Sequence, residues 1–386
     1  MEAFNGVAEL VRTSSPAGSR GGSKRPPAFL ANILAKRPPL VELSSPGPTH
    51  IATANVTHSA APKVAGNAAL EKQETVQHDD DYEFIKMLGH GGSASVEMVQ
   101  GNYTGSLYAR KIYRNIYTRN VKAAEKRLLE EVQIMRRLAP HHHIIRVHAT
   151  YVVKRELAII LEPVANGGDL ATFLTNYRDR ELWRGNDRAI EDDILHQAFG
   201  CLASGLAFMH RQSIRHKDIK PQNVLIHNQT VLYTDFGLSY DFVDAGQSTT
   251  TGLVQGLTMR YCAPEVADHG RRNTKSDIFS LGCVFIEIHS VLYPDELMEE
   301  LLDGPFFRQL RILPNQGLPV DCGHPEMDAI RAMVRLDSTS RPTAAEVVDH
   351  FADIIEALYF CGQCWGWVGV ENKSEKLISQ VAGSTT

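Results

Sequence analysis

The chain has 386 residues, of which 43% are hydrophobic and 22% are charged. These are ordinary values for a globular protein, and the length suits one large or two-lobed domain with tails. The net charge of −5 gives no general argument for nucleic acid or an acidic membrane surface, and no apolar run approaches the roughly 20 residues of a membrane helix. We therefore expect neither nucleic acid nor a membrane as a partner.

Residues 1–78 differ in composition from the rest of the chain. They hold eight of the 18 prolines, and eight Lys/Arg against five Asp/Glu give them a charge of +3, which leaves −8 for the remainder. Such a segment buries too little apolar surface to offset its chain entropy, so we expect residues 1–80 to be a disordered Pro/Ser/Gly-rich region. The basic stretch 12–37 matches an organelle transit sequence only in part, because Glu2, Glu9 and several prolines depart from that pattern.

Regular structure is expected from about residue 81. Residues 82–113 show three strand-like segments separated by glycine-bearing turns, and two more strands are expected over 144–153 and 157–161. Between them, residues 120–139 have apolar side chains at helical spacing, which predicts one amphipathic helix.

From residue 168 onward the pattern becomes mostly helical. Helices are expected over 169–177, 191–211, 275–292, 297–303, 325–335 and 343–358. A small strand-rich lobe followed by a larger helical lobe is an α+β, bilobal architecture. We place this domain at 81–356, its small lobe at 81–162, its large lobe at 166–356 and a tail at 357–386.

The segment LGHGGSASV (88–96) puts Gly89, Gly91 and Gly92 between two strands. Glycine lets backbone N–H groups approach a polyphosphate without a Cβ in the way. A dinucleotide-binding fingerprint would continue directly into a helix, whereas 95–99 has a strand pattern. The segment therefore favours a hairpin over phosphates, although glycine-rich hairpins are often only turns.

Two charged residues of the small lobe form a candidate pair. Lys111 lies in a strand and Glu131 lies twenty residues later in the amphipathic helix. A lone strand lysine usually faces solvent, but a helix glutamate beside it would hold the ammonium against nucleotide phosphates and compensate a buried charge. After the last strand of this lobe, the backbone near Glu162 and Val164 is suited to read an adenine edge.

The stretches IRHKDIKPQNVL (214–225) and VLYTDFGLSY (231–240) carry the groups for phosphoryl transfer. Asp218 can orient an attacking hydroxyl and accept its proton, and Lys220 can balance charge on the moving phosphoryl group. Asn223 and Asp235 supply the hard oxygen ligands that Mg²⁺ prefers.

The order and spacing of these motifs resemble the eukaryotic protein kinase family over about residues 82–356. The resemblance is carried by the Gly-rich loop (89–96), Lys111, Glu131, the catalytic loop (216–223), D-F-G (235–237), A-P-E (263–265), Asp277 and Arg341, the last of which looks like the family's buried partner for Glu265. KPQN (220–223) is similar to the serine/threonine branch. The resemblance implies transfer of the γ-phosphoryl group of ATP to Ser/Thr hydroxyls of protein substrates, with Mg²⁺.

The same resemblance implies the roles of individual residues. The catalytic group comprises Asp218, Lys220, Lys111 and Glu131. The ATP-binding group comprises Leu88, Gly89, Gly91, Gly92, Val96, Ala109, Lys111, Glu162, Val164, Asp169, Asn223 and Asp235. The Mg²⁺ ligands are Asn223 and Asp235.

Three residues depart from the family's pattern. Ala94 stands at the third glycine position of the phosphate loop, so we expect weaker or slower ATP handling but not its loss. Leu257 stands where many relatives have glycine, before a retained Thr258 that we expect to bond the catalytic residues. Lys217 replaces arginine, which keeps the charge but not the bidentate fork to a phosphate.

These departures leave two alternatives open. One is a pseudokinase scaffold with weak or no transfer, against which the intact catalytic residues argue. The other is a small-molecule kinase of related fold, which A-P-E, Thr258 and Arg341 make less favoured because these residues build the family's protein-substrate platform.

Four consecutive hydroxyl residues, Ser248–Thr251, lie between D-F-G and A-P-E. A phosphate added there by an upstream kinase would pair with Lys217, with Arg260 as a second candidate, and order the loop. A merely solvated Ser/Thr loop is an equally open interpretation.

The cysteines and histidines of the chain include candidate metal ligands. Most of the six cysteines sit singly in apolar surroundings, as in reduced intracellular proteins, so we expect a cytoplasmic or nuclear location. HHH (141–143) invites a metal interpretation, but three adjacent residues rarely converge on one ion. CGQC (361–364) has zinc spacing, yet it is a single pair and DCGH (321–324) is an incomplete second, so packing roles are favoured over zinc.

Overall fold

The computed structural model describes residues 79–90, 94–113, 121–153, 156–179, 187–241, 258–270, 272–320, 322–354 and 358–367. The predictions made for residues 1–78, for Gly91 and Gly92, for Ser248–Thr251 and for Leu257 lie outside these residues.

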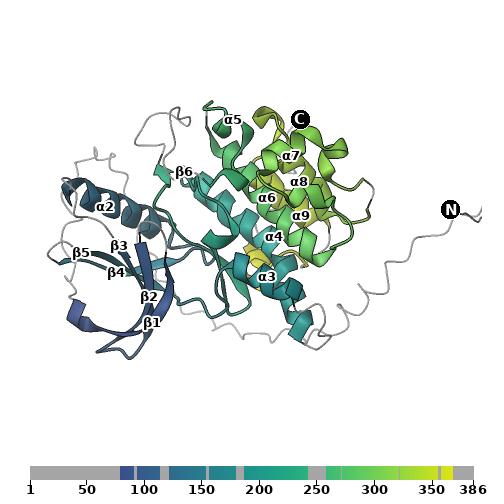
Figure 1. The fold of residues 1–386 in the computed structure, drawn as a ribbon. Coiled ribbons are helices and arrows are strands. Elements are labelled where there is room, and N and C mark those ends of the chain that lie inside the picture. Colours follow the sequence, from purple (N-terminus) through teal and green to yellow (C-terminus); the bar gives the residue numbers. More distant parts are fainter. Residues whose placement is uncertain are drawn as a thin grey trace, which may run out of the picture. The chain divides into compact units, whose positions relative to one another are not determined.

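The small lobe is a five-stranded antiparallel sheet with one helix (Figure 1). Its strands are β1 (Tyr82–His90), β2 (Ala94–Gly101), β3 (Leu107–Tyr113), β4 (Arg146–Val153) and β5 (Glu156–Glu162), in the order β1-β2-β3-β5-β4. The helix α2 (Val121–Leu138) contacts β4 and β5. It buries the side chains of Leu128, Val132, Met135 and Leu138, the apolar face expected from their helical spacing.

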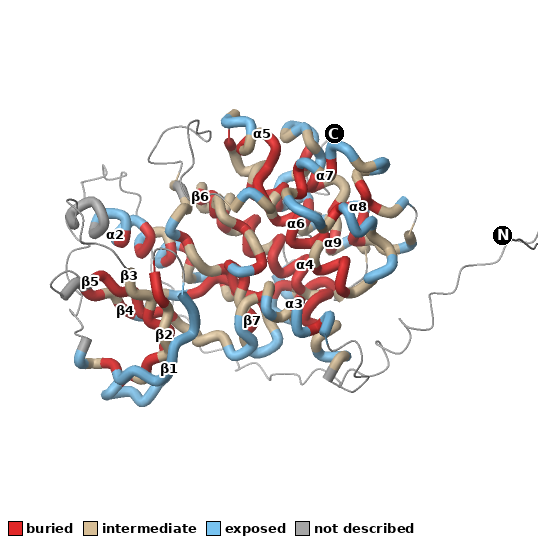
Figure 2. Tube along the Cα trace, viewed as in Figure 1, coloured by how far each residue is buried: buried red, intermediate tan, exposed pale blue. Residues whose placement is uncertain are grey.

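The large lobe is built around two long helices. Its helices are α3 (Leu170–Asp179), α4 (Asp187–Arg211), α5 (Pro264–Ala267), α6 (Thr274–Leu292), α7 (Phe306–Ile312), α8 (Glu326–Met333) and α9 (Ala344–Ile354). Figure 2 shows the buried residues concentrated along α4, α6 and α9, whereas β1 in the small lobe is largely exposed. Because α6 is apolar on nearly all sides, it forms the centre of this lobe.

The remaining described elements are short. Two-stranded sheets pair β6 (Ile214–Arg215) with β9 (Tyr240–Asp241) and β7 (Val224–His227) with β8 (Thr230–Tyr233). Single 3-10 turns are η1 (Asp79–Asp81), η3 (Pro221–Asn223), η4 (Met259–Tyr261), η5 (Glu299–Leu302), η6 (Pro314–Gly317) and η7 (Ser338–Ser340). The isolated bridge between Ile144 and Tyr233 ties the entry to β4 to the end of β8.

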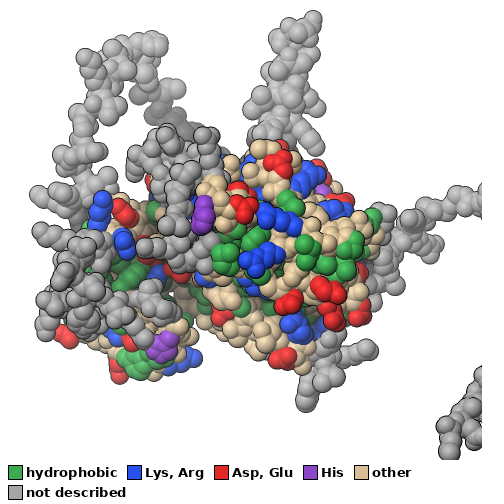
Figure 3. Space-filling model, turned by 45° about the horizontal axis from the view of Figure 1, so that its top comes forward, with side chains coloured by type: hydrophobic (Ala, Val, Ile, Leu, Met, Phe, Trp, Pro, Cys, Tyr) green, Lys and Arg blue, Asp and Glu red, His purple; other side chains and the backbone are tan. Residues whose placement is uncertain are grey.

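The predicted α+β, two-lobed architecture is confirmed. The expected helix over 297–303 is instead the 3-10 turn η5, and the hairpins β6–β9 and β7–β8 were not predicted because strands of two to four residues are too short to show periodicity. Among the helices that the structure describes, none combines the length and the apolar composition of a membrane span. On the face in Figure 3, Lys and Arg side chains lie among acidic and hydrophobic ones.

Candidate active site

Lys111 lies between two carboxylates that come from different parts of the chain. Its Nζ is 2.9 Å from Glu131 Oε1 on α2 and 2.8 Å from Asp235 Oδ1, which follows β8. The contact expected between Lys111 and Glu131 is therefore present. Gly237 packs against the same group, since a Cβ there would lie 3.3 Å from Glu131 Oε2 and would crowd the ion pair.

The electrostatics of this group keep it charged. Burial by itself would lower the pKa of Lys111, but Glu131 and Asp235 outweigh burial and raise that pKa well above its ordinary value. Burial would raise the pKa of Asp235, yet the charge and hydrogen bond of Lys111 hold it below its ordinary value. The side chain of Asp235 is 45% exposed, so its ionised carboxylate is accessible to solvent.

Tyr113 is a member of this group that the sequence interpretation missed. Its hydroxyl donates a hydrogen bond to Glu131 Oε2. Side chains two residues apart on a strand share a face, so Tyr113 on β3 lies on the same side of the sheet as Lys111. The alternation of side chains along this strand could have predicted that Tyr113 lies beside Lys111.

The carboxylate of Asp218 is held by three side chains. Lys220 Nζ lies 2.7 Å from Oδ2, Asn223 Nδ2 donates to Oδ2 at 3.0 Å, and Thr258 Oγ1 donates to Oδ1 at 3.1 Å. Lys220 also donates to Thr258 Oγ1 at 3.0 Å, so the expected bonding of Thr258 to Asp218 and Lys220 is present. Asn223 Nδ2 additionally donates to the backbone carbonyl of Asp218 at 2.8 Å, which closes the loop on itself.

Asp277 of α6 accepts hydrogen bonds from the first residues of the loop that carries Asp218. It accepts the backbone N–H groups of His216 at 3.0 Å and Lys217 at 2.9 Å, and His210 Nε2 lies 3.1 Å from its Oδ2. Lys217 adopts a φ of 70°, a left-handed conformation that non-glycine residues rarely take. The two N–H bonds offset that cost and aim the following Asp218 at the site.

Asp277→Asn is expected to destabilise the fold by about 1–3 kcal/mol, because an amide cannot accept from all three donors. Burial would raise the pKa of Asp277, but the His210 and Lys217 bonds hold it below its ordinary value. A depressed folded pKa stabilises the fold above the unfolded pKa of about 3.9, and this contribution is lost as the pH falls through the folded pKa. Urea unfolding of both chains should show a difference that is constant near pH 6 and shrinks below pH ~4; a difference independent of pH would contradict the assignment.

The A-P-E segment itself is held by a buried ion pair. Arg341 donates from Nη1 and Nη2 to the two oxygens of Glu265, both at 2.8 Å, and Ser276 Oγ donates to Glu265 Oε1 at 2.8 Å. The expected partnership of Arg341 and Glu265 is therefore present, and it fixes α5 against α6 and the loop before α9.

The two basic residues considered for a loop phosphate have different surroundings. Arg260 is 2.8 Å from Glu287 and donates to the carbonyls of Leu302 and Gly304, so its guanidinium is committed within the large lobe and the prediction of a phosphate partner there is withdrawn. Lys217 instead lines a pocket together with Arg215 and Arg272. Arg215 directly precedes the loop of residues 216–223, and Lys217 is part of it.

The residues predicted to bind nucleotide are distributed over the small lobe and the linker. Leu88 and Gly89 lie on exposed β1, Val96 pairs with Lys111 across β2 and β3, and Ala109 pairs with Leu161 across β3 and β5. Glu162 ends β5 and Val164 follows it, half-buried. Asp169 caps α3, accepting from the backbone N–H and the hydroxyl of Thr172, both at 3.0 Å.

The arrangement agrees with what sequence comparison finds. The family profile described as "Protein kinase domain" matches residues 82–351. Mitogen-activated protein kinase kinase 2 of Arabidopsis thaliana is 29% identical over 288 residues, which cover 70% of this chain and 71% of that protein. Mitogen-activated protein kinase kinase SIPKK of Nicotiana tabacum is 27% identical over 311 residues, covering 75% and 79%. CBL-interacting serine/threonine-protein kinase 7 of Arabidopsis thaliana is 31% identical over 207 residues, covering 53% and 44%. The chain therefore belongs to the protein kinase family.

Proposed function

We propose that the chain transfers the γ-phosphoryl group of ATP to serine and threonine hydroxyls of protein substrates. The observation that carries this proposal is the Asp218 carboxylate, bonded to Lys220, Asn223 and Thr258, in the same unit as the Lys111 group. These are the parts that phosphoryl transfer uses for positioning and for charge stabilisation.

The residues fit the metal that this chemistry needs. The amide nitrogen of Asn223 donates its hydrogen bonds to Asp218. The side-chain carbonyl oxygen of Asn223 is therefore the atom that can coordinate a cation. Asp235 contributes a partly exposed carboxylate. Its partial burial would raise its pKa, but Lys111 holds that pKa below its ordinary value. Amide and carboxylate oxygens suit Mg²⁺, which when bound supplies positive charge to the phosphates.

The proposed reaction balances with Asp218 as the base. The substrate hydroxyl oxygen forms the new bond to the γ-phosphorus, and the bond from that phosphorus to the bridging oxygen of ADP breaks. The hydroxyl proton passes to the carboxylate of Asp218. Lys220, 2.7 Å from the same carboxylate, is placed to balance charge on the transferred group, and Lys111 is placed to hold the remaining phosphates.

The test is transfer of labelled phosphate by the full chain to a degenerate peptide array containing Ser, Thr and Tyr, with Mg²⁺ and ATP. Label on Ser and Thr peptides, strongly reduced in Asp218→Asn, is the expected result. Nucleotide binding without transfer to any peptide or protein would favour the pseudokinase alternative and overturn the proposal.

We also propose that a phosphate on one of Ser248–Thr251, added by an upstream kinase, is bound beside Lys217. The support is the pocket that Lys217 shares with Arg215 and Arg272. Burial and these two arginines lower the pKa of Lys217, and Asp277 raises it, so a phosphate bound in this pocket would offset the clustered positive charge.

Phosphatase treatment of active protein is therefore expected to lower its activity roughly tenfold, since a charge-assisted hydrogen bond contributes about 1.5–3 kcal/mol. Lys217→Ala should lower activity similarly and remove the response to phosphatase. Lys126→Ala, an exposed lysine of α2, is the matched control and should respond like the unaltered chain. Mass spectrometry that finds no phosphate at 248–251 in the active protein would rule out this regulation.

A further inference from the structure

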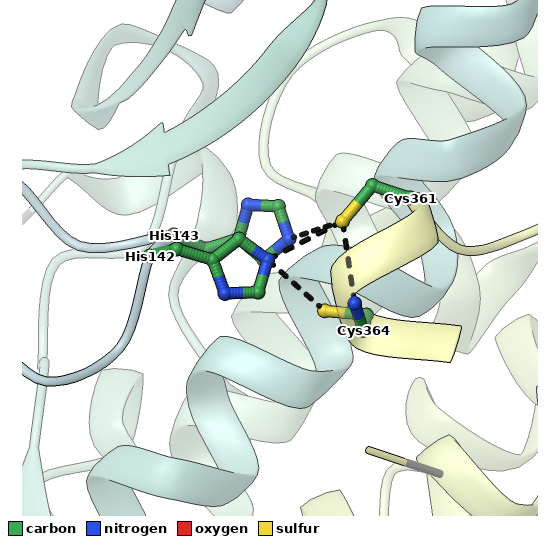
Figure 4. Close-up of side chains that lie close together, drawn as sticks. All are labelled: His142, His143, Cys361 and Cys364. Atoms are coloured by element: carbon green, nitrogen blue, oxygen red, sulfur yellow. Dashed lines mark hydrogen bonds between the residues drawn. The ribbon is translucent and has the colours of Figure 1, made fainter. Parts of the chain in front are cut away.

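Two segments far apart in sequence meet beside α4 and bring four metal-ligating side chains together. One is the α2–β4 loop (residues 139–145), and the other is the C-terminal segment (residues 358–367). His142 and His143 of the loop and Cys361 and Cys364 of the segment place one ligand atom each within 4.8 Å of one another. Figure 4 shows the two imidazole rings pointing toward the two sulfur atoms.

The distances between these atoms match those around a single tetrahedral ion. Cys361 Sγ lies 3.3 Å from His142 Nε2 and 3.5 Å from His143 Nε2, and Cys364 Sγ lies 3.5 Å from His142 Nε2. A tetrahedral zinc ion with N and S bonds of about 2.0–2.1 and 2.3 Å separates its nitrogen and sulfur ligands by about 3.5–3.6 Å. These three nitrogen–sulfur distances are therefore close to those of a Cys₂His₂ site, and the remaining pairs of ligand atoms lie within 4.8 Å of each other.

The second ring nitrogen of His143 orients it as a ligand. Its Nδ1 lies 2.6 Å from the carbonyl oxygen of Val231, so Nδ1 carries the hydrogen and Nε2 presents a lone pair to the sulfurs. A backbone carbonyl in this position is the usual outer partner of a metal-bound histidine. His142 also reaches polar neighbours through Nε2 alone, because its Nδ1 is buried without a hydrogen-bond partner among the described residues.

Hydrogen bonds alone give this group only weak partners. The Cys361 thiol could donate to His143 Nε2 and the Cys364 thiol to His142 Nε2, each across 3.5 Å between sulfur and nitrogen, and S–H is a weak donor. The two cysteines are free thiols. Cys361 Sγ also accepts the backbone N–H of Cys364 at 3.5 Å. One divalent cation would satisfy all four atoms at once.

The C-terminal segment is firmly docked, so the four ligands are held in place. The backbone N–H of Gly200 on α4 donates to the carbonyl of Tyr359 at 3.0 Å, and a Cβ at Gly200 would lie 2.4 Å from that oxygen. Tyr359 and Phe360 are buried in the core of the large lobe, and Tyr359 donates to Glu326 at 2.7 Å. The folded unit thus continues beyond the domain boundary expected at residue 356.

We propose that His142, His143, Cys361 and Cys364 form a structural zinc site that fastens the C-terminal segment to the α2–β4 loop. Two nitrogens and two sulfurs from the protein are the ligand set of closed, structural zinc sites, and thiolates disfavour Mg²⁺ or Ca²⁺. The site lies close to the catalytic apparatus, because the backbone of His143 accepts the N–H of Tyr233 at 2.8 Å, two residues before Asp235. The α2–β4 loop also directly follows α2, the helix that carries Glu131.

The first test is the metal content of the full chain, purified without added chelator and measured by elemental mass spectrometry. The expected content is one zinc per chain, falling roughly tenfold or more in Cys361→Ser and in Cys364→Ser. Two controls should retain zinc: Cys322→Ser, a half-buried cysteine elsewhere in the large lobe, and His141→Gln, whose ring nitrogens already contact His143 N and Ser204 Oγ. Equal zinc in all five chains, or none in the unaltered chain after zinc is added and excess removed, would overturn the proposal.

The second test keeps the proposal falsifiable if the serine variants do not fold. The unaltered chain is stripped with a chelator and titrated with Co²⁺, which is expected to give the intense visible bands of tetrahedral cobalt with thiolate charge transfer. Cobalt should also quench the fluorescence of Trp367, whose ring lies 5.1 Å from that of His142. The stripped chain should unfold at lower temperature and recover on addition of one equivalent of zinc. Weak octahedral cobalt bands, or a Cys361–Cys364 disulfide found by mass spectrometry in freshly purified, unstripped protein, would refute a zinc site in favour of a redox pair.

Discussion

Asp218→Asn is expected to transfer phosphoryl groups about 10²–10⁴-fold more slowly than the unaltered chain, because the amide cannot accept the proton of the attacking hydroxyl. The change is nearly isosteric, so the three side chains around the carboxylate keep their positions. Lys111 and Asp235 are untouched, and nucleotide affinity should therefore stay within about twofold. The measurements are the initial rate with the best peptide from the array and nucleotide binding by calorimetry.

A matched control separates this effect from a general effect of losing a carboxylate. Asp268 is an exposed aspartate of the large lobe, paired with Arg311 at 2.9 Å and outside the catalytic group. Asp268→Asn should retain the rate of the unaltered chain. If Asp218→Asn transfers as fast as this control, Asp218 is not the base and the proposed mechanism is wrong.

Arg341→Ala should lower the free energy of unfolding by about 3–5 kcal/mol, the cost typical of breaking a buried ion pair. The side chain of Arg341 is fully buried, makes two bonds of 2.8 Å to Glu265 and also donates to the carbonyls of Arg335, Lys275 and Leu336. Truncation leaves one carboxylate and three carbonyls without this partner. Urea unfolding monitored by fluorescence, analysed with the slope as well as the midpoint, measures the change.

Arg311→Ala is the control for that variant, because it removes an arginine–aspartate pair that is largely exposed. Such pairs contribute under about 1 kcal/mol. Similar losses in the two variants would mean that the burial and the five hydrogen bonds of Arg341 add nothing to stability, contrary to the structural argument.

Most of the candidate site could be predicted because its motifs are short. Asp218, Lys220 and Asn223 lie within six residues, so the loop that brings them together is written in one stretch of sequence. The pairing of Lys111 with Glu131 followed from a strand and a helix whose periodicities were both clear. Tyr113 and the anchoring of Lys217 by Asp277 were not assigned, because each depends on a contact that no local pattern specifies.

The sequence by itself determined the two-lobed fold and predicted the candidate catalytic groups, since apolar periodicity and closely spaced polar residues act locally. Only the tertiary structure decided that Arg260 forms an ion pair with Glu287. It also decided that His142 and His143 lie beside the two cysteines of the CGQC segment. His142 and Cys361 are 219 positions apart, and each pair alone is half of a ligand set. They meet because the C-terminal segment docks at Gly200 of α4, a close approach that depends on packing across the whole large lobe.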